Sequence, residues 1–313
     1  MKKKRLLIYT LSLSLITSYI NLNKQKSNEL SKNIIEYTKT FPDDDFKIAA
    51  HRGFSSKAVE NTSEAIKLAA NESYIDYIEI DARMTKDNYL VLSHNDDIYK
   101  STFYKTEISE TNYEDLENNS FNYIVNLKLI DYFKALIDTE KKLDLKRKTL
   151  LQNKDYQIST LKESLNLVSN KKVIIDLKFS DNVKEFTKKV MDEFKNINTK
   201  NIYFQSSNLL GILYFEQVTN YNCFAIIDSS KDLKYLDLFD NLTIRKNLID
   251  YDTIKYLLDQ KKNVAIWTIN SSSEIDNIKN CLKELYKDVI YITDYPDLIA
   301  TTLNDKYKTK IKK

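Results

Sequence analysis

The sequence has 313 residues, of which 42% are hydrophobic and 12% aromatic, so it is long and apolar enough to fold around a large buried core. The formal net charge is +3, and the first five residues contribute four positive charges, which leaves the rest of the chain at 3 − 4 = −1. The chain has no basic stripe interleaved with aromatic residues, and this argues against a nucleic-acid substrate.

The first thirty residues predict a targeting segment. A basic start is followed by an apolar run at residues 6–20 and then by a polar stretch, which is the profile of an export signal. The run is shorter than the roughly 20 residues of a membrane span, yet no small-x-small cleavage site or lipobox cysteine follows it. A cleaved signal peptide and an uncleaved N-terminal membrane anchor therefore both stay open, with a cytoplasmic amphipathic start as a third alternative. Either of the first two would place residues 31–313 outside the cytoplasmic membrane, secreted or anchored at its outer face.

From residue 47 onward, short β-rich runs alternate with helical patterns, which is typical of a parallel sheet with crossover helices. Helical patterns occur at residues 62–70, 160–168, 183–194, 251–260 and 273–285. The predicted strands are residues 47–51, 77–81, 173–178, 201–206, 222–227, 241–246, 263–268 and 288–293. Eight repeats over roughly 250 residues predict a TIM (β/α)8 barrel, in which the chemistry lies at the carboxyl ends of the strands.

Residues 103–158 interrupt this alternation and predict a mainly helical insertion between the second and third barrel strands. Within it, apolar residues recur at helical spacing, namely Leu129, Ile130, Phe133, Leu136 and Ile137. This helix either packs on the barrel or forms a lid that contacts substrate or membrane. The charge-rich residues 138–154 predict a solvated face.

The two histidines of the chain, His51 and His94, each stand at the end of an apolar run that predicts a strand, and several carboxylates lie between them. This arrangement indicates acid–base chemistry beside a cation, although chance is the better explanation of either histidine alone.

Glu79 and Asp81 are two residues apart on a predicted strand, so their side chains point the same way. Asp176 and Lys178 repeat this spacing on the next barrel strand. Three carboxylates at neighbouring strand ends form an oxygen-rich cage that suits Ca²⁺ or Mg²⁺. The alternative for each pair by itself is a salt bridge to Arg83 or Lys178.

A series of motifs surrounds these residues in chain order. They are HRG at 51–53, EN at 60–61, EIDARMTKD at 79–87, TLKESL at 160–165, IIDLK at 174–178, FQSS at 204–207, WTIN at 267–270 and ITDYPD at 292–297. In this order the sequence closely resembles the glycerophosphodiester phosphodiesterase family. The resemblance covers residues 47 to about 301 and weakens in the insertion and in the fifth and sixth repeats.

The resemblance implies a TIM-barrel enzyme that hydrolyses glycerophosphodiesters to glycerol 3-phosphate and an alcohol with one divalent cation, Ca²⁺ or Mg²⁺. It further suggests that the nucleophile is the substrate's own glycerol hydroxyl. By motif, the implied roles are general acid–base catalysis for His51 and His94, metal ligation for Glu79, Asp81 and Asp176, and phosphate neutralisation for Arg52 and Lys178.

Three more residues have two interpretations each. Glu60 and Asn61 either orient Arg52 or the metal shell, or simply begin the first helix. Trp267 forms an apolar wall for the glycerol carbons or belongs to the core.

The sequence departs from the family pattern at three positions. Asp176 replaces the usual glutamate ligand, Asn95 replaces the aspartate after His94, and Val59 replaces the proline before EN. None of these removes a required charge, so activity is expected to survive, and the departures bear on metal affinity and metal preference.

The expected substrate is a small glycerophosphodiester from deacylated phospholipid, or a glycerol-phosphate polymer of a cell envelope. Two alternatives remain: a phospholipase-type phosphodiesterase that acts on intact lipid, and a non-catalytic envelope protein that retains the fold.

Overall fold

The computed structural model describes residues 46–96, 106–119, 121–122, 131, 134–136, 138–152 and 154–303. The predicted targeting segment and most of the apolar positions between 129 and 137 lie outside these residues, so those predictions stay open. Within the described residues, no helix combines the length and apolar character needed to cross a membrane.

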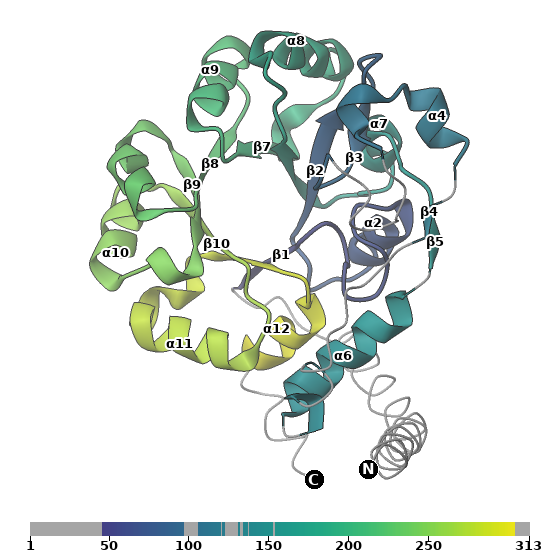
Figure 1. Ribbon diagram of the computed structural model, residues 1–313. Coiled ribbons are helices and arrows are strands. Elements are labelled where there is room, and N and C mark those ends of the chain that lie inside the picture. Colours follow the sequence, from purple (N-terminus) through teal and green to yellow (C-terminus); the bar gives the residue numbers. More distant parts are fainter. Residues whose placement is uncertain are drawn as a thin grey trace, which may run out of the picture. The chain divides into compact units, whose positions relative to one another are not determined.

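Eight parallel strands form a closed barrel (Figure 1). They are β1 (Lys47–Ala50), β2 (Tyr77–Met84), β6 (Lys172–Leu177), β7 (Ile202–Ser206), β8 (Cys223–Ile227), β9 (Asn241–Arg245), β10 (Asn263–Trp267) and β11 (Ile290–Thr293). The ring closes at β1, which pairs with β11 on one side and with β2 on the other. The predicted (β/α)8 barrel is confirmed, and every barrel strand end except the carboxyl end of β2 agrees with the prediction to within two residues.

A ninth strand, β3 (Leu90–Leu92), lies outside the barrel. It pairs antiparallel with the end of β2, where Ala82 faces Leu92. The run predicted to end at His94 therefore ends as a strand at Leu92, and β2 extends to Met84 because this antiparallel partner continues its ladder.

Helices surround the barrel: α2 (Ser63–Ala70), α7 (Leu161–Leu165), α8 (Val183–Phe194), α9 (Leu209–Thr219), α10 (Tyr251–Asp259), α11 (Ser272–Leu282) and α12 (Pro296–Leu303) (Figure 1). Polar caps begin most of them, because the cap side chain accepts a hydrogen bond from an otherwise unpaired N–H of the first turn. Thr62 accepts from the backbone N–H of Ala65, and Thr160 forms a capping box with Glu163. Two predicted helices end early: α7 stops at Leu165, and α11 passes into a 3₁₀ turn at Lys283–Lys287.

The insertion, where it is described, contains α4 (Tyr113–Glu117), α6 (Thr139–Leu151) and the 3₁₀ turn Ile108–Glu110, together with two short strands, β4 (Phe121–Asn122) and β5 (Asp155–Tyr156). These strands pair with each other. Ile108, Leu116, Phe121 and Ile158 form a separate apolar cluster against Val91 of β3. The expected solvated face at 138–154 is wrong at Leu151, which is buried, and at Arg147 of α6, which is buried against the carboxylate of Asp297.

Gly53 is expected to be the less replaceable of the two glycines. Its φ is +77°, and a Cβ atom there would lie 2.7 Å from the backbone carbonyl carbon of Ala65. Gly53→Ala should therefore lower the free energy of unfolding by about 2–3 kcal/mol in urea denaturation. Gly211→Ala is the matched control, because its Cβ would meet mainly side chains of Asn208 and Phe179, which can shift. Equal losses in the two variants would contradict the expectation.

Candidate active site

Three carboxylates gather at the carboxyl ends of two adjacent strands. Glu79 and Asp81 lie on β2, and the parallel register places Asp81 beside Asp176 of β6. All three are buried, with one ligand oxygen from each within 4.8 Å of the others. The sequence thus located a real cluster, and the strand period of two is the reason that Glu79 and Asp81 share a face.

Hydrogen bonds fix the two carboxylates of β2. Glu79 Oε2 accepts from the backbone N–H of Arg52 at 2.9 Å, and its Oε1 accepts from Gln205 Nε2 at 3.3 Å. Thr243 in turn donates its hydroxyl to Gln205 Oε1 at 3.0 Å, which orients the amide. Asn61 donates to Asp81 Oδ2 at 2.8 Å and accepts from the backbone N–H of Asp81 at 3.0 Å.

The basic side chains expected to neutralise a phosphate also contact the cluster. Lys178 Nζ lies 2.9 Å from Asp81 Oδ1 and 2.6 Å from Asp176 Oδ2. Arg52 Nε lies 3.3 Å from Asp81 Oδ2, while its Nη1 donates to Glu60 Oε1 at 2.8 Å. This contact favours the interpretation that Glu60 orients Arg52.

Arg83 has a different role from the salt bridge considered as an alternative. Its guanidinium donates to the backbone carbonyl of His94, from Nε at 3.1 Å and from Nη2 at 2.8 Å. Arg83 lies on the same side of the strand as Glu79 and Asp81, but its guanidinium binds the backbone carbonyl of His94 and so fixes the loop that carries this histidine.

The pKa values of the three carboxyl groups differ, because their electrostatic surroundings differ. Burial, and then the charge of Asp81, raise the pKa of Glu79 to about 7. Burial likewise raises the pKa of Asp176 to about 6. Burial acts in the same direction on Asp81, but the nearby Lys178 and Arg52 cations outweigh it and hold the pKa of Asp81 well below its usual range.

The residues present fit a hard divalent cation. Asp176 Oδ1 is buried and has no hydrogen-bond partner among the described residues, and a buried carboxylate oxygen without a donor is costly. Three oxygen ligands with surplus negative charge are the donor set that Ca²⁺ and Mg²⁺ take in proteins. Glu79, Asp81 and Asp176 are therefore the residues that would hold such an ion.

His51 follows β1 and is held by an aspartate from the opposite end of the sequence. Its Nδ1 lies 2.6 Å from Asp294 Oδ1, while its Nε2 lies 4.0 Å from Glu79 Oε2. A carboxylate can only accept, so Nδ1 carries the proton in this contact and Nε2 is directed to the cluster. Burial alone would lower the pKa of His51, but the charge of Asp294 raises it above the ordinary value.

Asp294 is itself fixed by Asn270. Asn270 Nδ2 donates to Asp294 Oδ2 at 2.5 Å, and Asn270 Oδ1 accepts from the backbone N–H of Asp294 at 3.0 Å. Sequence reasoning missed both residues as site members, although they stand in the ITDYPD and WTIN motifs. The available signal was their position after the last two barrel strands, Asp294 directly after β11 and Asn270 three residues after the end of β10, since barrel closure brings β11 next to β1.

His94 has the opposite electrostatic character. Its Nδ1 contacts Asn95 Oδ1 at 3.0 Å. Burial, together with the Arg52 and Lys178 cations, lowers the pKa of His94 to about 4 against the attraction of Asp81. This imidazole is therefore neutral at pH 7, whereas the Asp294 contact favours a protonated His51, and such a divergence suits one general base and one general acid.

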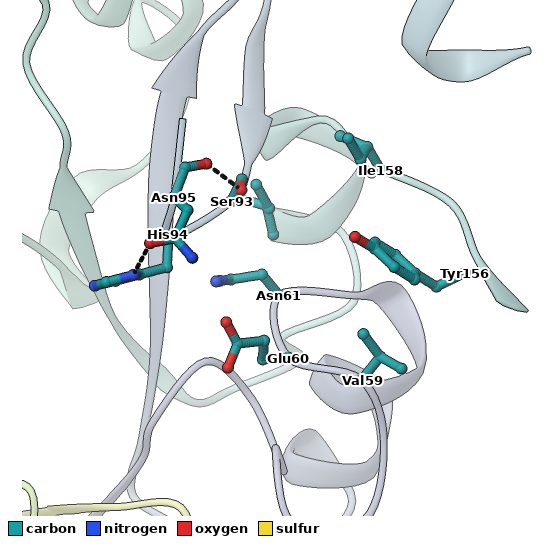
Figure 2. A pocket seen from close by; sticks show the side chains of 9 residues that line it. Val59, Glu60, Asn61, Ser93, His94, Asn95, Tyr156 and Ile158 are labelled. Carbon is teal, nitrogen blue, oxygen red and sulfur yellow. Dashed lines mark hydrogen bonds between the residues drawn. The ribbon is translucent and has the colours of Figure 1, made fainter. Parts of the chain in front are cut away.

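A pocket opens beside His94 (Figure 2). Its walls come from the loop before α2, from the end of β3 and the loop after it, and from the insertion. The lining residues are Val59, Glu60, Asn61, Leu92, Ser93, His94, Asn95, Tyr156 and Ile158. Trp267 lies elsewhere, at the carboxyl end of β10, where it packs against the apolar barrel interior. Its indole Nε1 is buried without a hydrogen-bond partner among the described residues.

Comparison with known proteins gives consistent matches. The Glycerophosphoryl diester phosphodiesterase family model matches residues 51–298. A human lysophospholipase D is 27% identical over 203 residues, which are 63% of this chain and 53% of the human protein. A glycerophosphodiester phosphodiesterase of Bacillus altitudinis is 35% identical over 77 residues, 25% of this chain and 31% of that protein. The match thus spans about half the length of the human relative and about a third of the length of the bacterial one.

Solved structures share the fold. A phosphodiesterase of Oleispira antarctica, in complex with the product sn-glycerol-3-phosphate, has a TM-score of 0.63 at 20% identity and covers 82% of this chain and 96% of its own. A Silicibacter pomeroyi structure described as a glycerophosphoryl diester phosphodiesterase has a TM-score of 0.65 at 15% identity, covering 86% and 97%. Because the family match includes both histidines, the three carboxylates and Asp294, the chain belongs to the glycerophosphoryl diester phosphodiesterase family.

Proposed function

We propose that this protein is a phosphodiesterase that hydrolyses glycerophosphodiesters to sn-glycerol 3-phosphate and an alcohol. The observation that carries the proposal is the pair of oppositely tuned histidines beside a buried three-carboxylate cluster. Phosphodiester hydrolysis needs a base for the attacking hydroxyl, an acid for the leaving alkoxide and positive charge for the phosphoryl oxygens. The proposal assigns each of these roles to a different residue.

In this proposal His94, neutral at pH 7, accepts the proton of the glycerol hydroxyl that attacks the phosphorus, and His51 donates a proton from Nε2 to the leaving alcohol oxygen. Water then opens the resulting cyclic phosphate to sn-glycerol 3-phosphate, with His51 as the base and His94 as the acid. Asp294 stabilises the protonated imidazole of His51 through Nδ1. Arg52 and Lys178 provide fixed positive charge at the mouth of the barrel. One Ca²⁺ or Mg²⁺, held by Glu79, Asp81 and Asp176, would supply Lewis-acid stabilisation of charge on the phosphate.

The direct test is release of sn-glycerol 3-phosphate from glycerophosphocholine, glycerophosphoethanolamine and glycerophosphoglycerol by the purified protein. We expect turnover that EDTA abolishes and that added Ca²⁺ or Mg²⁺ restores. Turnover that is insensitive to EDTA would contradict the cation requirement. An inert protein across all substrates and both ions would instead favour the non-catalytic alternative.

A lipid substrate is the second candidate. It is favoured by the human relative, a lysophospholipase D, and by the apolar side of the pocket beside His94, where Val59, Leu92 and Ile158 lie. Faster release of choline from lysophosphatidylcholine than from glycerophosphocholine under the same conditions would support the lipid substrate over the soluble diester.

A further inference from the structure

One face of α6 is polar and lies against the barrel rim. Glu140, Asp144 and Arg147 follow the i, i+4, i+7 spacing that places side chains on one side of a helix. Each contacts a different part of the rim, and Figure 1 shows α6 next to α12. Because the contacts are spaced along two helical turns, they fix the orientation of the helix as well as its position.

The three contacts are specific. Glu140 Oε1 accepts from the backbone N–H of Ser272 at 2.8 Å, at the start of α11. Asp144 accepts a short hydrogen bond from the hydroxyl of Tyr295. Arg147 Nη2 lies 3.0 and 2.9 Å from the two carboxylate oxygens of Asp297, and its guanidinium carbon is 4.5 Å from the centre of the Tyr295 ring.

Burial makes the Arg147 contact costly to break. Arg147 is 8% exposed and Asp297 is 1% exposed, unlike an ordinary surface ion pair. Removing one member of such a pair leaves an uncompensated buried charge. Lys57, from the loop between β1 and α2, also lies 3.5 Å from Asp297, but it is more exposed and does not replace the two-oxygen contact.

The rim segments that α6 contacts are the ones that hold His51. Ser272 lies two residues after Asn270, and Tyr295 directly follows Asp294. Asn270 and Asp294 bind each other, and Asp294 binds His51. The helix therefore bridges two loops whose relative position decides where the carboxylate of Asp294 lies.

We propose that α6 clamps these two loops in register and that Arg147 is a positioning residue for His51. His94 is held separately, by Arg83 and Asn95, so the clamp acts on one histidine and not on the other. The proposal therefore predicts that loss of Arg147 changes His51 and leaves His94 unchanged. Its kinetic consequence rests on the proposed function, whereas its structural consequence does not.

The two-histidine composition permits a direct test. Protein labelled with [15N]histidine should give two imidazole signal sets in NMR spectra, and the His94→Gln variant assigns them. In Arg147→Ala we expect the Nδ1 resonance of His51 to shift or lose its hydrogen-bonded proton, while the His94 resonances stay unchanged. Arg147→Lys, which keeps the charge, should retain most of the wild-type His51 signal. Lys141→Ala, exposed on the same helix, is the matched control.

The kinetic arm uses glycerophosphocholine. Arg147→Ala should lower kcat by about 10- to 100-fold with KM little changed, because a displaced proton donor affects the chemical step. In an Asp294→Ala background the same change should cost less than about twofold, since both act through one contact. Glu140→Gln, a milder change to the same clamp, should lower kcat in the same direction.

Either of two NMR results would overturn the clamp: an unchanged His51 spectrum in Arg147→Ala, or equal shifts in both histidines, which would indicate general loosening. Full additivity of Arg147→Ala with Asp294→Ala would also refute it. An inactive wild-type protein would refute the proposed function instead, and the NMR result would still decide whether the clamp exists.

Discussion

Replacing His51 with alanine is expected to lower kcat for glycerophosphodiester hydrolysis by about 10²–10⁴-fold, because the leaving alkoxide then departs without a proton donor. The same range is expected for His94→Ala through loss of the base. KM should change little, since Arg52 and Lys178 stay in place. The measurement is steady-state release of sn-glycerol 3-phosphate, with thermal melting of each variant to show that the barrel is intact.

Added imidazole offers a sharper version of this experiment. It should restore part of the activity of each alanine variant, because a small free base or acid can enter the space left by the side chain. Leu210→Ala, with a wild-type side chain that is 80% exposed on α9, serves as the control and should match wild type. Full activity in either histidine variant would contradict the assigned acid–base roles.

Glu79→Gln is expected to separate cation binding from stability. Neutralising this side chain removes repulsion from Asp81 and Asp176, so the metal-free variant should melt at or above the wild-type temperature. The same change removes a ligand, and the affinity for Ca²⁺ or Mg²⁺ should fall by at least about 100-fold, the upper end of the loss for an outer-shell partner. Calorimetric titration and melting with and without each ion measure the two effects.

The stability of the metal-free protein should depend on pH through Glu79. Its pKa is raised from 4.5 to about 7 in the folded state, so its favourable contribution is complete below pH 4.5 and is lost as the pH rises through about 7. The stabilisation by Glu79→Gln should therefore be larger at pH 8 than at pH 5. Glu114→Gln, an exposed carboxylate on α4, should show neither effect. Unchanged cation affinity in Glu79→Gln would remove it from the ligand set.

The barrel and the acidic cluster were predictable from local patterns. Strand alternation and run length located all eight barrel strands, and the two-residue spacing put Glu79 and Asp81 on one face. Each of these patterns extends over only a few neighbouring residues, so it can be recognised in one sequence without knowledge of the fold. The antiparallel pairing of β3 was not predictable, because its partner is the extension of β2 beyond the barrel.

The residues that hold His51 depend on contacts between distant parts of the chain. His51 and Asp294 are 243 positions apart, and Arg147 and Asp297 are 150 apart. Nothing in the run at 138–154 distinguishes the buried Arg147 from its solvated neighbours until the partner carboxylate is placed. Burial of a charge is a tertiary property, and composition alone predicts the commoner exposed state.

The closing seam of the barrel has a consequence for synthesis. His51 leaves the first strand and Asp294 leaves the last, and these two strands pair with each other. A growing polypeptide therefore holds both histidines and all three carboxylates long before it holds the partner of His51. Chains cut short before β11 lack that partner, so full activity should emerge only when translation reaches the final strand.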